Sequence, residues 1–220
     1  AGALTGHSMG MALHDEAVND LVHKLWRNGY FEGPLDPAAL AAFGIDLGEL
    51  SGLVSNFSLS MSSPLPPVGE IRANGQLRIG LAGLRIALTI PGSSDPTPLE
   101  FEVTGIFDAT PTIMGDRIAI TAVNTVSLDL RVTTAPAGVA PNVVNALLTV
   151  ATSLTDRIVK DVLAQSLVGL PVPSLHLPQT LGPISLAKPL TLGIVNGALS
   201  ASGTYPTRYL VITGDILEQP

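Results

Sequence analysis

The stretch that decides the fold is NVVNALLTVATSLTDRIVKDVLAQSL, residues 142–167. Its aliphatic side chains recur at three- and four-residue steps, which is the period of an α-helix. They are Val144, Leu147, Leu148, Ala151, Leu154, Ile158 and Val162. At about 1.5 Å per residue this helix would be roughly 40 Å long. A helix this apolar must be covered, and the flanking sequence offers β-sheet to cover it.

Strand patterns flank the long helix on both sides. Before it, alternating apolar and polar residues predict strands at 57–63, 70–90, 99–107, 117–122 and 126–133. The alternation in residues 70–90 changes phase at Gly83, which predicts a β-bulge or a sharp bend. After the helix, a proline-rich tract through Pro173, Pro178 and Pro183 leads to predicted strands at 190–199 and 209–213.

A shorter helix is predicted from His14 to Asn28. Asp15 is suited to its N-cap or first turn, and Gly29 is suited to the position after its last residue. Its apolar stripe consists of Val18, Leu21, Val22 and Leu25, with Trp26 beside it. A further short helix, opened by Asp36-Pro37, is predicted for residues 38–43, and residues 47–54 fit either another helical turn or a loop.

These elements predict an α+β fold in which a strongly twisted antiparallel sheet wraps around one long and one shorter helix. Residues 1–12 are expected to be a flexible tail or linker, and residues 13–220 a single domain. No signal peptide is visible at the N-terminus. From Val132 to Thr155 the chain has no charged side chain, a length that would span a bilayer. Because its apolar residues favour one side, we interpret this stretch as a buried amphipathic helix.

Composition narrows the functional class. Hydrophobic residues make up 46% of the 220 residues and aromatic residues only 4%, so the apolar mass is aliphatic. Such a composition suits a cavity for acyl chains or sterols. The formal net charge of −7 disfavours nucleic acid as a partner. The absence of cysteine excludes disulfides and thiolate metal sites, and leaves the cellular compartment open.

Two segments resemble the family of bactericidal/permeability-increasing protein and lipopolysaccharide-binding protein, most closely its C-terminal domain. One is the opening helix, HDEAVN at residues 14–19 through Leu25, which ends in Asn28-Gly29-Tyr30. The other runs from Val144 to Pro173, a long helix leading into Leu-Pro-Val-Pro, followed by late strands that end in the apolar run of residues 209–212. The similar order of elements extends over nearly the whole chain from about Leu13.

The resemblance implies a tubular lipid-binding fold that holds a lipid between sheet and helices, with a sister domain or a homodimer as partner. It also implies transient contact with a membrane surface, and a location in the cell envelope (periplasm) or outside the cell. The chain departs from the family in being acidic and in lacking cysteine, so capture of endotoxin by a basic tip is not expected. We therefore predict a non-enzymatic protein that binds, and carries or transfers, an acyl or sterol-like lipid. The predicted lining residues are Leu21, Leu25, Trp26, Val144, Leu148, Ala151, Leu154 and Ile158.

Several other patterns have alternative interpretations. Gly6-His7-Ser8-Met9-Gly10 matches the G-x-S-x-G motif of serine esterases, but too few residues precede it to form the strand and the oxyanion loop. The four histidines do not suggest three converging zinc ligands, so no metal or other cofactor is predicted. The acidic pairs Asp15/Glu16 and Glu100/Glu102 are expected to complement a helix N-terminus and to form the wet face of a strand.

Two alternatives stay open at the level of sequence. Trp26, Tyr30 and Phe31 form an aromatic cluster that fits either core packing or the wall or mouth of a cavity. The same β-wrapped helix also fits a purely structural module with a filled core, which would serve as a scaffold or dimerisation domain.

Overall fold

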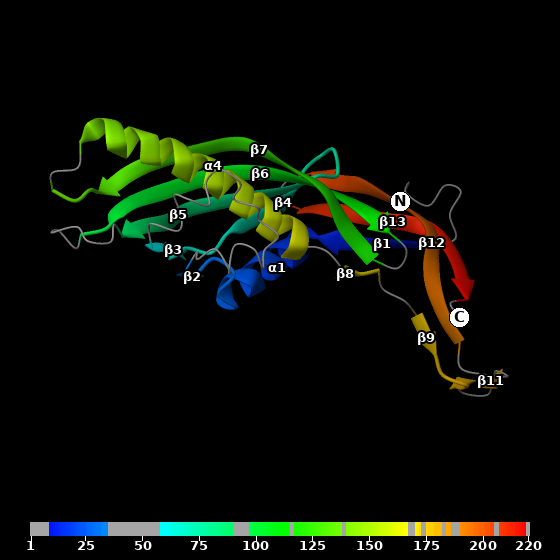
Figure 1. The fold of residues 1–220 in the computed structure, drawn as a ribbon. Helices are drawn as coiled ribbons and strands as arrows, with labels where there is room; N and C mark the ends of the chain where they lie inside the picture. The colour runs from blue at the N-terminus through cyan, green and yellow to red at the C-terminus, as the bar shows by residue number, and fades with distance from the viewer. Residues whose placement is uncertain are drawn as a thin grey trace.

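The computed structural model describes residues 9–34, 58–89, 97–114, 117–137, 140–166, 170–172, 175–181, 184–185, 190–204 and 207–218. Within these ranges two helices lie against an elongated, strongly twisted antiparallel β structure (Figure 1). The strands form a seven-stranded sheet, a four-stranded sheet and a small two-stranded ribbon. The predicted α+β class, with one long and one shorter helix on an antiparallel sheet, is confirmed.

The chain enters the described structure in a strand. β1 (Met9–His14) pairs antiparallel with β13 (Thr207–Glu218), and Met9 lies opposite Gly214. The prediction of a flexible tail up to residue 12 is therefore wrong for residues 9–12, because pairing with β13 holds their backbone. Residues 1–8, which include Ser8, lie outside the described residues. The assignment of residues 13–220 to a single domain stays a prediction.

The shorter helix, α1 (Asp15–Arg27), matches the predicted range within one residue at each end. His14 is its N-cap, and the His14 side chain accepts a hydrogen bond from the Glu16 N–H at 3.2 Å. At the other end Gly29 has a φ of +77°, a left-handed conformation that glycine adopts without steric cost. The N–H groups of Gly29 and Tyr30 donate to the carbonyls of Trp26 and Leu25, which is the double hydrogen bond of a Schellman C-cap.

The seven-stranded sheet has the order β2-β3-β5-β6-β7-β8, with β4 also paired to β5. Its strands are β2 (Gly33–Pro34), β3 (Ser58–Ser62), β4 (Val68–Ile71), β5 (Leu77–Thr89), β6 (Leu99–Met114), β7 (Arg117–Thr134) and β8 (Leu170–Pro171). The run predicted at residues 70–90 is a hairpin of β4 and β5, because Gly75, at a φ of +83°, turns the chain between them. The predicted bulge is confirmed: Gly83 has a φ of +68°, and the β5–β6 register shifts between Leu81 and Leu84.

The next segments form one long hairpin rather than three short strands. β6 continues past Phe107 to Met114, and β7 is a single strand where two strands, at 117–122 and 126–133, were predicted. The register between β6 and β7 shifts between Ile106 and Phe107 and again between Thr110 and Pro111. These irregularities absorb extra residues on either side of Asn124 without breaking the pairing, so the prediction of two strands is wrong.

The long helix, α4 (Pro141–Ser166), matches the predicted range within one residue at each end. It packs against β7 and β6 and crosses one face of the sheet (Figure 1). Its buried residues include the predicted Leu147, Ala151, Leu154, Ile158 and Val162. None of the described helices combines the length and the hydropathy needed to cross a membrane.

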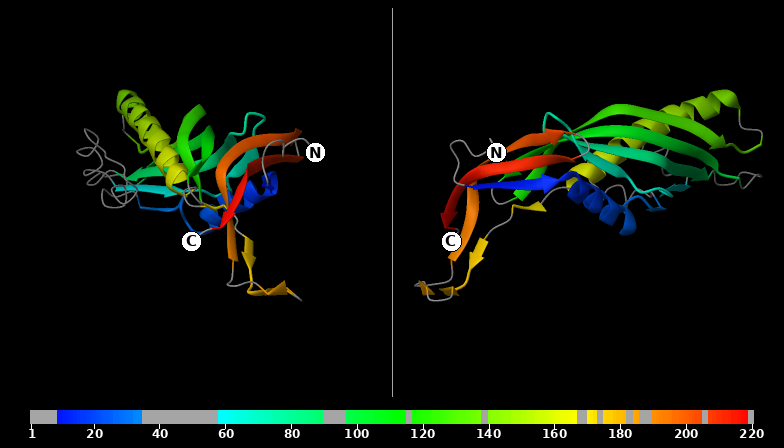
Figure 2. Two further views of the ribbon diagram at one scale, coloured as in Figure 1. Left: turned by 90° about the vertical axis from the view of Figure 1, so that its right-hand side faces the viewer. Right: turned by 180° about the vertical axis from the view of Figure 1, so that it is seen from behind.

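The four-stranded sheet has the order β1-β13-β12-β9 and extends away from α4 (Figure 2). It includes β9 (Leu175–Leu177) and β12 (Leu190–Thr204), and the small ribbon consists of β10 (Thr180–Leu181) and β11 (Ile184–Ser185). The predicted final strands are confirmed but are longer, because β12 and β13 pair along most of their length. Of the other predictions, the helix at 38–43 and the segment at 47–54 lie outside the described residues.

One face of the seven-stranded sheet is charged and the other is apolar. Arg78 on β5 lies opposite both Glu70 on β4 and Asp108 on β6, and it forms two hydrogen bonds of 2.7 and 2.8 Å with the Asp108 carboxylate. Further along the sheet, Arg131 on β7 pairs with Glu102 at 2.8 Å. The predicted solvent-facing side of the strand at Glu102 is thus confirmed. The alternate residues of the same strands face the helices.

Candidate lipid-binding site

All eight predicted lining residues lie in one apolar region. They belong to, or pack against, a cluster formed by α1, α4, β3, β5 and β6, which we call the inner layer. Leu25, Ala151, Leu154 and Ile158 are buried within the layer, and Ile158 is only 1% exposed. Leu21, Trp26, Val144 and Leu148 are half-buried and pack against it. The structure therefore brings together residues that are up to 137 positions apart in the chain, from Leu21 to Ile158.

The described part of the inner layer is densely packed at its centre and open at its margin. Leu84, Ile86, Leu99 and Val103 on β5 and β6 are fully buried there. The half-buried residues include Leu128 and Leu130 on β7, next to α4. Close-packed aliphatic side chains exclude water from the centre, so the margin is the part of the layer that a ligand can reach without displacing core residues.

The three predicted aromatic residues have three different environments. Phe31 is a core residue with an exposed fraction of 1%, whereas Tyr30 is 41% exposed. Trp26 is half-buried, and its indole N–H donates to the Ser63 carbonyl at 2.7 Å. This hydrogen bond fixes the ring at the margin of the inner layer, because a buried indole N–H needs an acceptor. Core packing is therefore confirmed for Phe31 only.

A hollow of about 280 Å³ lies beside α1, where it meets β1 and β5. Its walls are Leu13, Ala17, Val18, Leu21 and Leu77, and Asp20 and Lys24 stand at its polar side. We call this the α1 hollow. Leu21 also packs against the inner layer, so the hollow and the layer share one of the predicted lining residues. The volume is close to the lower end of the range of small-molecule pockets, about 300–1,000 Å³.

A second hollow, of about 340 Å³, lies at the N-terminal end of α1 and is polar. Asp15 lines it, but the Asp15 carboxylate is already occupied: it accepts hydrogen bonds from the N–H groups of Ile71 at 2.6 Å and Arg208 at 3.3 Å. Asn19 likewise accepts from the Gly69 N–H at 2.7 Å. These side chains hold α1 to β4 and β13. Asp15 also lies in the first turn of α1, as predicted, so its carboxylate stands at the N-terminus of its own helix while it binds the other two elements.

The polar side of α4 holds an ion pair between Asp156 and Lys160 and a second acid, Asp161. Asp156 accepts hydrogen bonds from Thr125 on β7 and from Lys160, at 2.7 Å for the lysine, and so fastens the middle of α4 to the outer strand. One turn further, burial raises the pKa of Asp161, and the charge of Arg157 opposes that shift. Thr155 is buried, and its hydroxyl donates to the carbonyl of Ala151, four residues earlier.

The remaining sequence motifs do not converge on a reactive site in the described structure. Met9 and Gly10, the last two residues of the G-x-S-x-G match, lie in β1, and Gly6, His7 and Ser8 lie outside the described residues. His14 contacts the Tyr209 ring, with ring centroids 4.9 Å apart, and His23 lies on α1 near Trp26. Among the described residues, no three histidine, aspartate or glutamate side chains are grouped so as to hold a metal ion.

Sequence reasoning missed most of the α1 hollow. Ala17, Asp20, Leu21 and Lys24 follow the three- and four-residue steps of one helix face, so their spacing could have indicated a second surface on α1 beside the core-facing stripe. Leu13 and Leu77 are brought to that surface by β1 and β5, and no local pattern predicts this contact. On α4, Val159 and Leu163 are fully buried and extend the predicted stripe.

No protein-family model matches the chain, and no curated protein matches it. Among solved structures, the chain is similar to the crystal structure of a lipopolysaccharide binding protein, with a TM-score of 0.45 and 10% sequence identity. The similarity covers 100% of this chain and 42% of that chain, so this chain spans less than half the length of the solved protein.

Proposed function

We propose that this protein binds a lipid by its acyl chain, without catalysis, and carries or transfers it. The observation behind the proposal is the inner layer, where two helices from distant parts of the chain lie on the apolar face of a twisted sheet. The centre of the layer is apolar and mainly aliphatic, with Phe31, Phe101 and Phe107 also buried in it, and its margin exposes half-buried side chains of both helices. This arrangement supports the tubular lipid-binding fold that the sequence resembles.

The driving force would be the removal of apolar area from water. Burial of a hydrocarbon chain is favourable by about 25 cal/mol per Å² of apolar surface. Contact with the margin of the layer and with the α1 hollow would therefore offset part of the cost of taking a chain out of a bilayer. No reactive side chain is needed for this function.

Transport in the cell envelope or outside the cell, transient contact with a membrane surface, and pairing with a sister domain or a second copy belong to the same proposal. They follow from the family that the sequence resembles. The charged face of the seven-stranded sheet, opposite the inner layer, supports a protein that remains hydrated while an apolar ligand occupies the other face.

A matched pair of substitutions on α4 tests the proposal. Leu148 is half-buried against the inner layer, whereas Val143, on the same helix, is 44% exposed. Uptake of a dansyl-labelled fatty acid is measured by its fluorescence. We expect Leu148→Glu to reduce uptake, because a carboxylate at the margin opposes an apolar chain, and Val143→Glu to leave it unchanged. No uptake of the fatty acid and no binding of an added lysophospholipid by the unmodified protein would together contradict lipid binding and would favour the scaffold alternative.

A further inference from the structure

The α1 hollow combines two features of a ligand site: it is partly open, and two opposite charges stand beside its apolar walls. Leu13 and Leu77 lie across from the α1 face formed by Ala17, Leu21 and their neighbours. Leu13, Ala17 and Leu21 are half-buried, so an incoming chain would contact them without moving the fully packed core.

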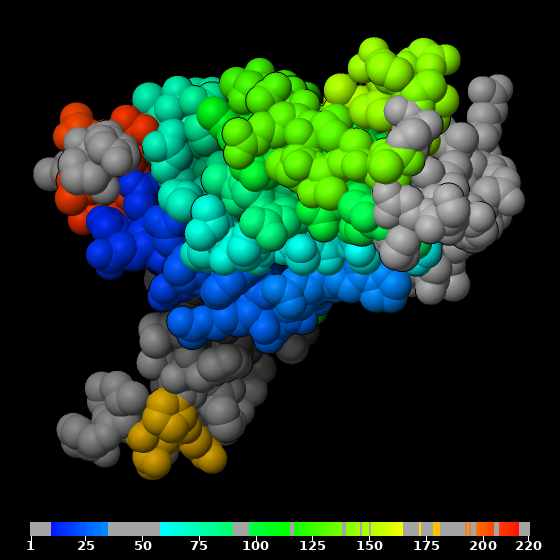
Figure 3. Space-filling model, turned by 90° about the vertical axis from the view of Figure 1, so that its left-hand side faces the viewer, coloured from blue at the N-terminus to red at the C-terminus, as the bar shows by residue number. Residues whose placement is uncertain are grey.

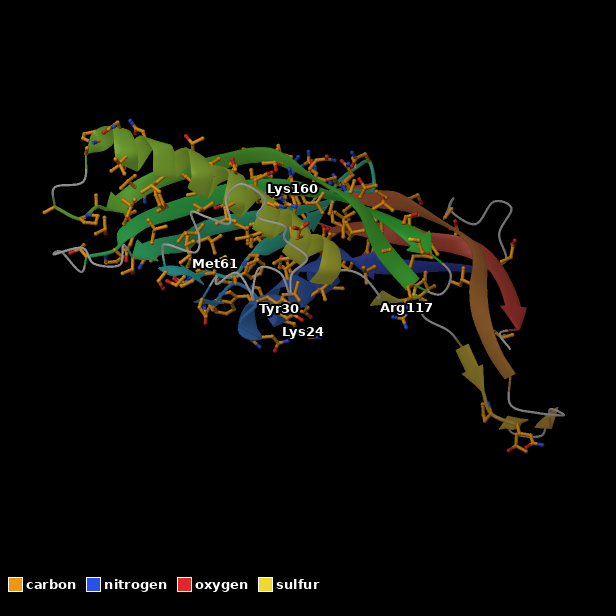
Figure 4. The ribbon with its side chains drawn as sticks, in the orientation of Figure 1. Lys24, Tyr30, Met61, Arg117 and Lys160 are labelled. Atoms are coloured by element: carbon orange, nitrogen blue, oxygen red, sulfur yellow. The ribbon has the colours of Figure 1, made fainter. Side chains whose placement is uncertain are left out.

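Asp20 and Lys24 are both exposed and lie four residues apart on the same helix face. Residues with this spacing are neighbours on a helix surface, roughly 5–6 Å apart at Cβ. They form no ion pair with each other, and within the described part of the chain neither forms one with another side chain. Figure 4 shows Lys24 on the outer side of α1, and Figure 3 shows the N-terminal residues, in blue, next to the early strands, in cyan.

We propose that the α1 hollow binds a single-chain amphiphile with a zwitterionic head, of the lysophosphatidylcholine type. This inference rests on the proposed function and names its ligand class. The acyl chain would lie against Leu13, Ala17, Leu21 and Leu77. The phosphate would face Lys24, and the ammonium group would face Asp20.

The volume of the α1 hollow and the charges beside it each narrow the class of ligand that it can bind. A hollow of about 280 Å³ accommodates part of one chain and is too small for two chains side by side. A fatty acid would match Lys24 but would bring its carboxylate close to Asp20, a like-charge contact that disfavours binding. A zwitterionic head group carries one charge of each sign, joined by a short linker, so it can pair with Lys24 and Asp20 at the same time.

The experiment measures binding of palmitoyl-lysophosphatidylcholine, palmitate and dipalmitoyl-phosphatidylcholine to the whole chain by calorimetry. The proposal predicts that the lysophospholipid binds most tightly. Asp20→Asn should weaken its binding roughly two- to five-fold, the size expected for an exposed ion pair. The same change should not weaken the binding of palmitate, because it removes a like charge.

Two further variants locate the site. Ala17→Trp should abolish binding of the lysophospholipid by filling the hollow, whereas Ala122→Trp, an exposed alanine on β7, should not change it. Glu16→Gln, on α1 but outside the hollow, serves as the charge control.

The outcomes separate the inference from the proposed function. If lipids bind but Ala17→Trp and Asp20→Asn have no effect, or if the two-chain lipid binds as tightly as the single-chain one, the site assignment is wrong and lipid binding stands. If none of the three amphiphiles binds the unmodified protein, the proposed function fails together with the inference.

Discussion

The backbone N–H of Ile71 donates to the carboxylate of Asp15 across 2.6 Å, although 56 positions separate the two residues. The other oxygen of the same carboxylate accepts the N–H of Arg208 on β13. Because β4 belongs to the seven-stranded sheet and β13 to the four-stranded sheet, this one buried side chain joins α1 to both. The guanidinium of Arg208 strengthens the junction by donating to the Ile71 carbonyl at 2.7 Å.

Asp15→Ala is expected to destabilise the fold strongly. The substitution leaves the N–H groups of Ile71 and Arg208 without an acceptor, and hydrogen bonds to a charged group contribute about 1.5–3 kcal/mol each. We expect a loss of roughly 3–6 kcal/mol in the free energy of unfolding, measured by urea denaturation. Glu16→Ala removes the neighbouring acid, which is exposed, and should change stability by less than about 0.5 kcal/mol. Equal effects of the two substitutions would contradict this role of Asp15.

Gly69 is required for the close approach of β4 to α1. A Cβ atom at this position would stand 2.7 Å from Val18 Cγ1, and valine in a helix has little freedom to rotate away. Gly69→Ala should therefore cost about 1–3 kcal/mol of stability. Gly80→Ala is the control, because its Cβ would meet nothing closer than 3.9 Å. Adding Val18→Ala to Gly69→Ala should restore part of the loss, and a thermal melt that shows no such recovery would rule out the steric explanation.

Ala151 lies in the packed core, so a larger side chain at this position would overpack the core instead of filling a ligand cavity. It is 5% exposed and packs among the residues of the inner layer. Ala151→Trp should lower the free energy of unfolding by about 1–3 kcal/mol or more through overpacking. Ala17→Trp, at the half-buried wall of the α1 hollow, should leave the midpoint of chemical denaturation nearly unchanged. The reverse order of stabilities would mean that the empty space lies under α4 instead.

Asp161 makes stability fall as the pH rises. Burial raises its pKa in the folded state above the ordinary value of 3.8, so the folded protein holds this proton more tightly than the unfolded chain does. Its protonated form is favoured by folding, and that advantage disappears as the pH rises from the ordinary aspartate range through the raised pKa. Asp161→Asn should consequently raise the melting temperature at neutral pH. Below pH 3.8 the difference from the unmodified protein should vanish; a constant difference at every pH would contradict the assignment.

Asp108 has the opposite pH dependence. Its hydrogen bonds with Arg78 lower its pKa, so its contribution to stability is present above the ordinary aspartate pKa and is lost as the pH falls through the lowered value. Asp108→Asn should destabilise the protein by about 1 kcal/mol at neutral pH. In strong acid the variant and the unmodified protein should melt together. A double-mutant cycle with Arg78→Met measures the pairwise part of the effect.

The elements with strong local signals were predictable, and the elements set by distant contacts were not. The period of α4 and the caps of α1 are local, so their ends were predicted within one residue. Gly83 was predicted as a bulge because the alternation itself changes phase there. By contrast, Met9–His14 forms a strand only because β13 pairs with it. β7 stays continuous because its pairing with β6 accommodates the register shifts.

The candidate site also has a part that local sequence patterns predict and a part that they do not. The eight lining residues chosen from the faces of two helices all meet in or against one layer, because helical spacing determines which residues share a face. The α1 hollow depends on Leu13 and Leu77, and sequence spacing does not indicate which strand residues will meet a given helix. The three aromatic residues separate into core, margin and surface because the Schellman turn at Gly29 directs Tyr30 and Phe31 into different environments.

Native mass spectrometry of the purified protein, with organic extraction of bound small molecules, tests the central claim most directly. Lipid binding predicts a discrete lipid mass that survives gentle desolvation, or uptake of added lysophospholipid at a one-to-one ratio. A clean mass of the protein alone, with no uptake of added phospholipid, fatty acid or sterol, would contradict lipid binding and would leave a scaffold with a filled core.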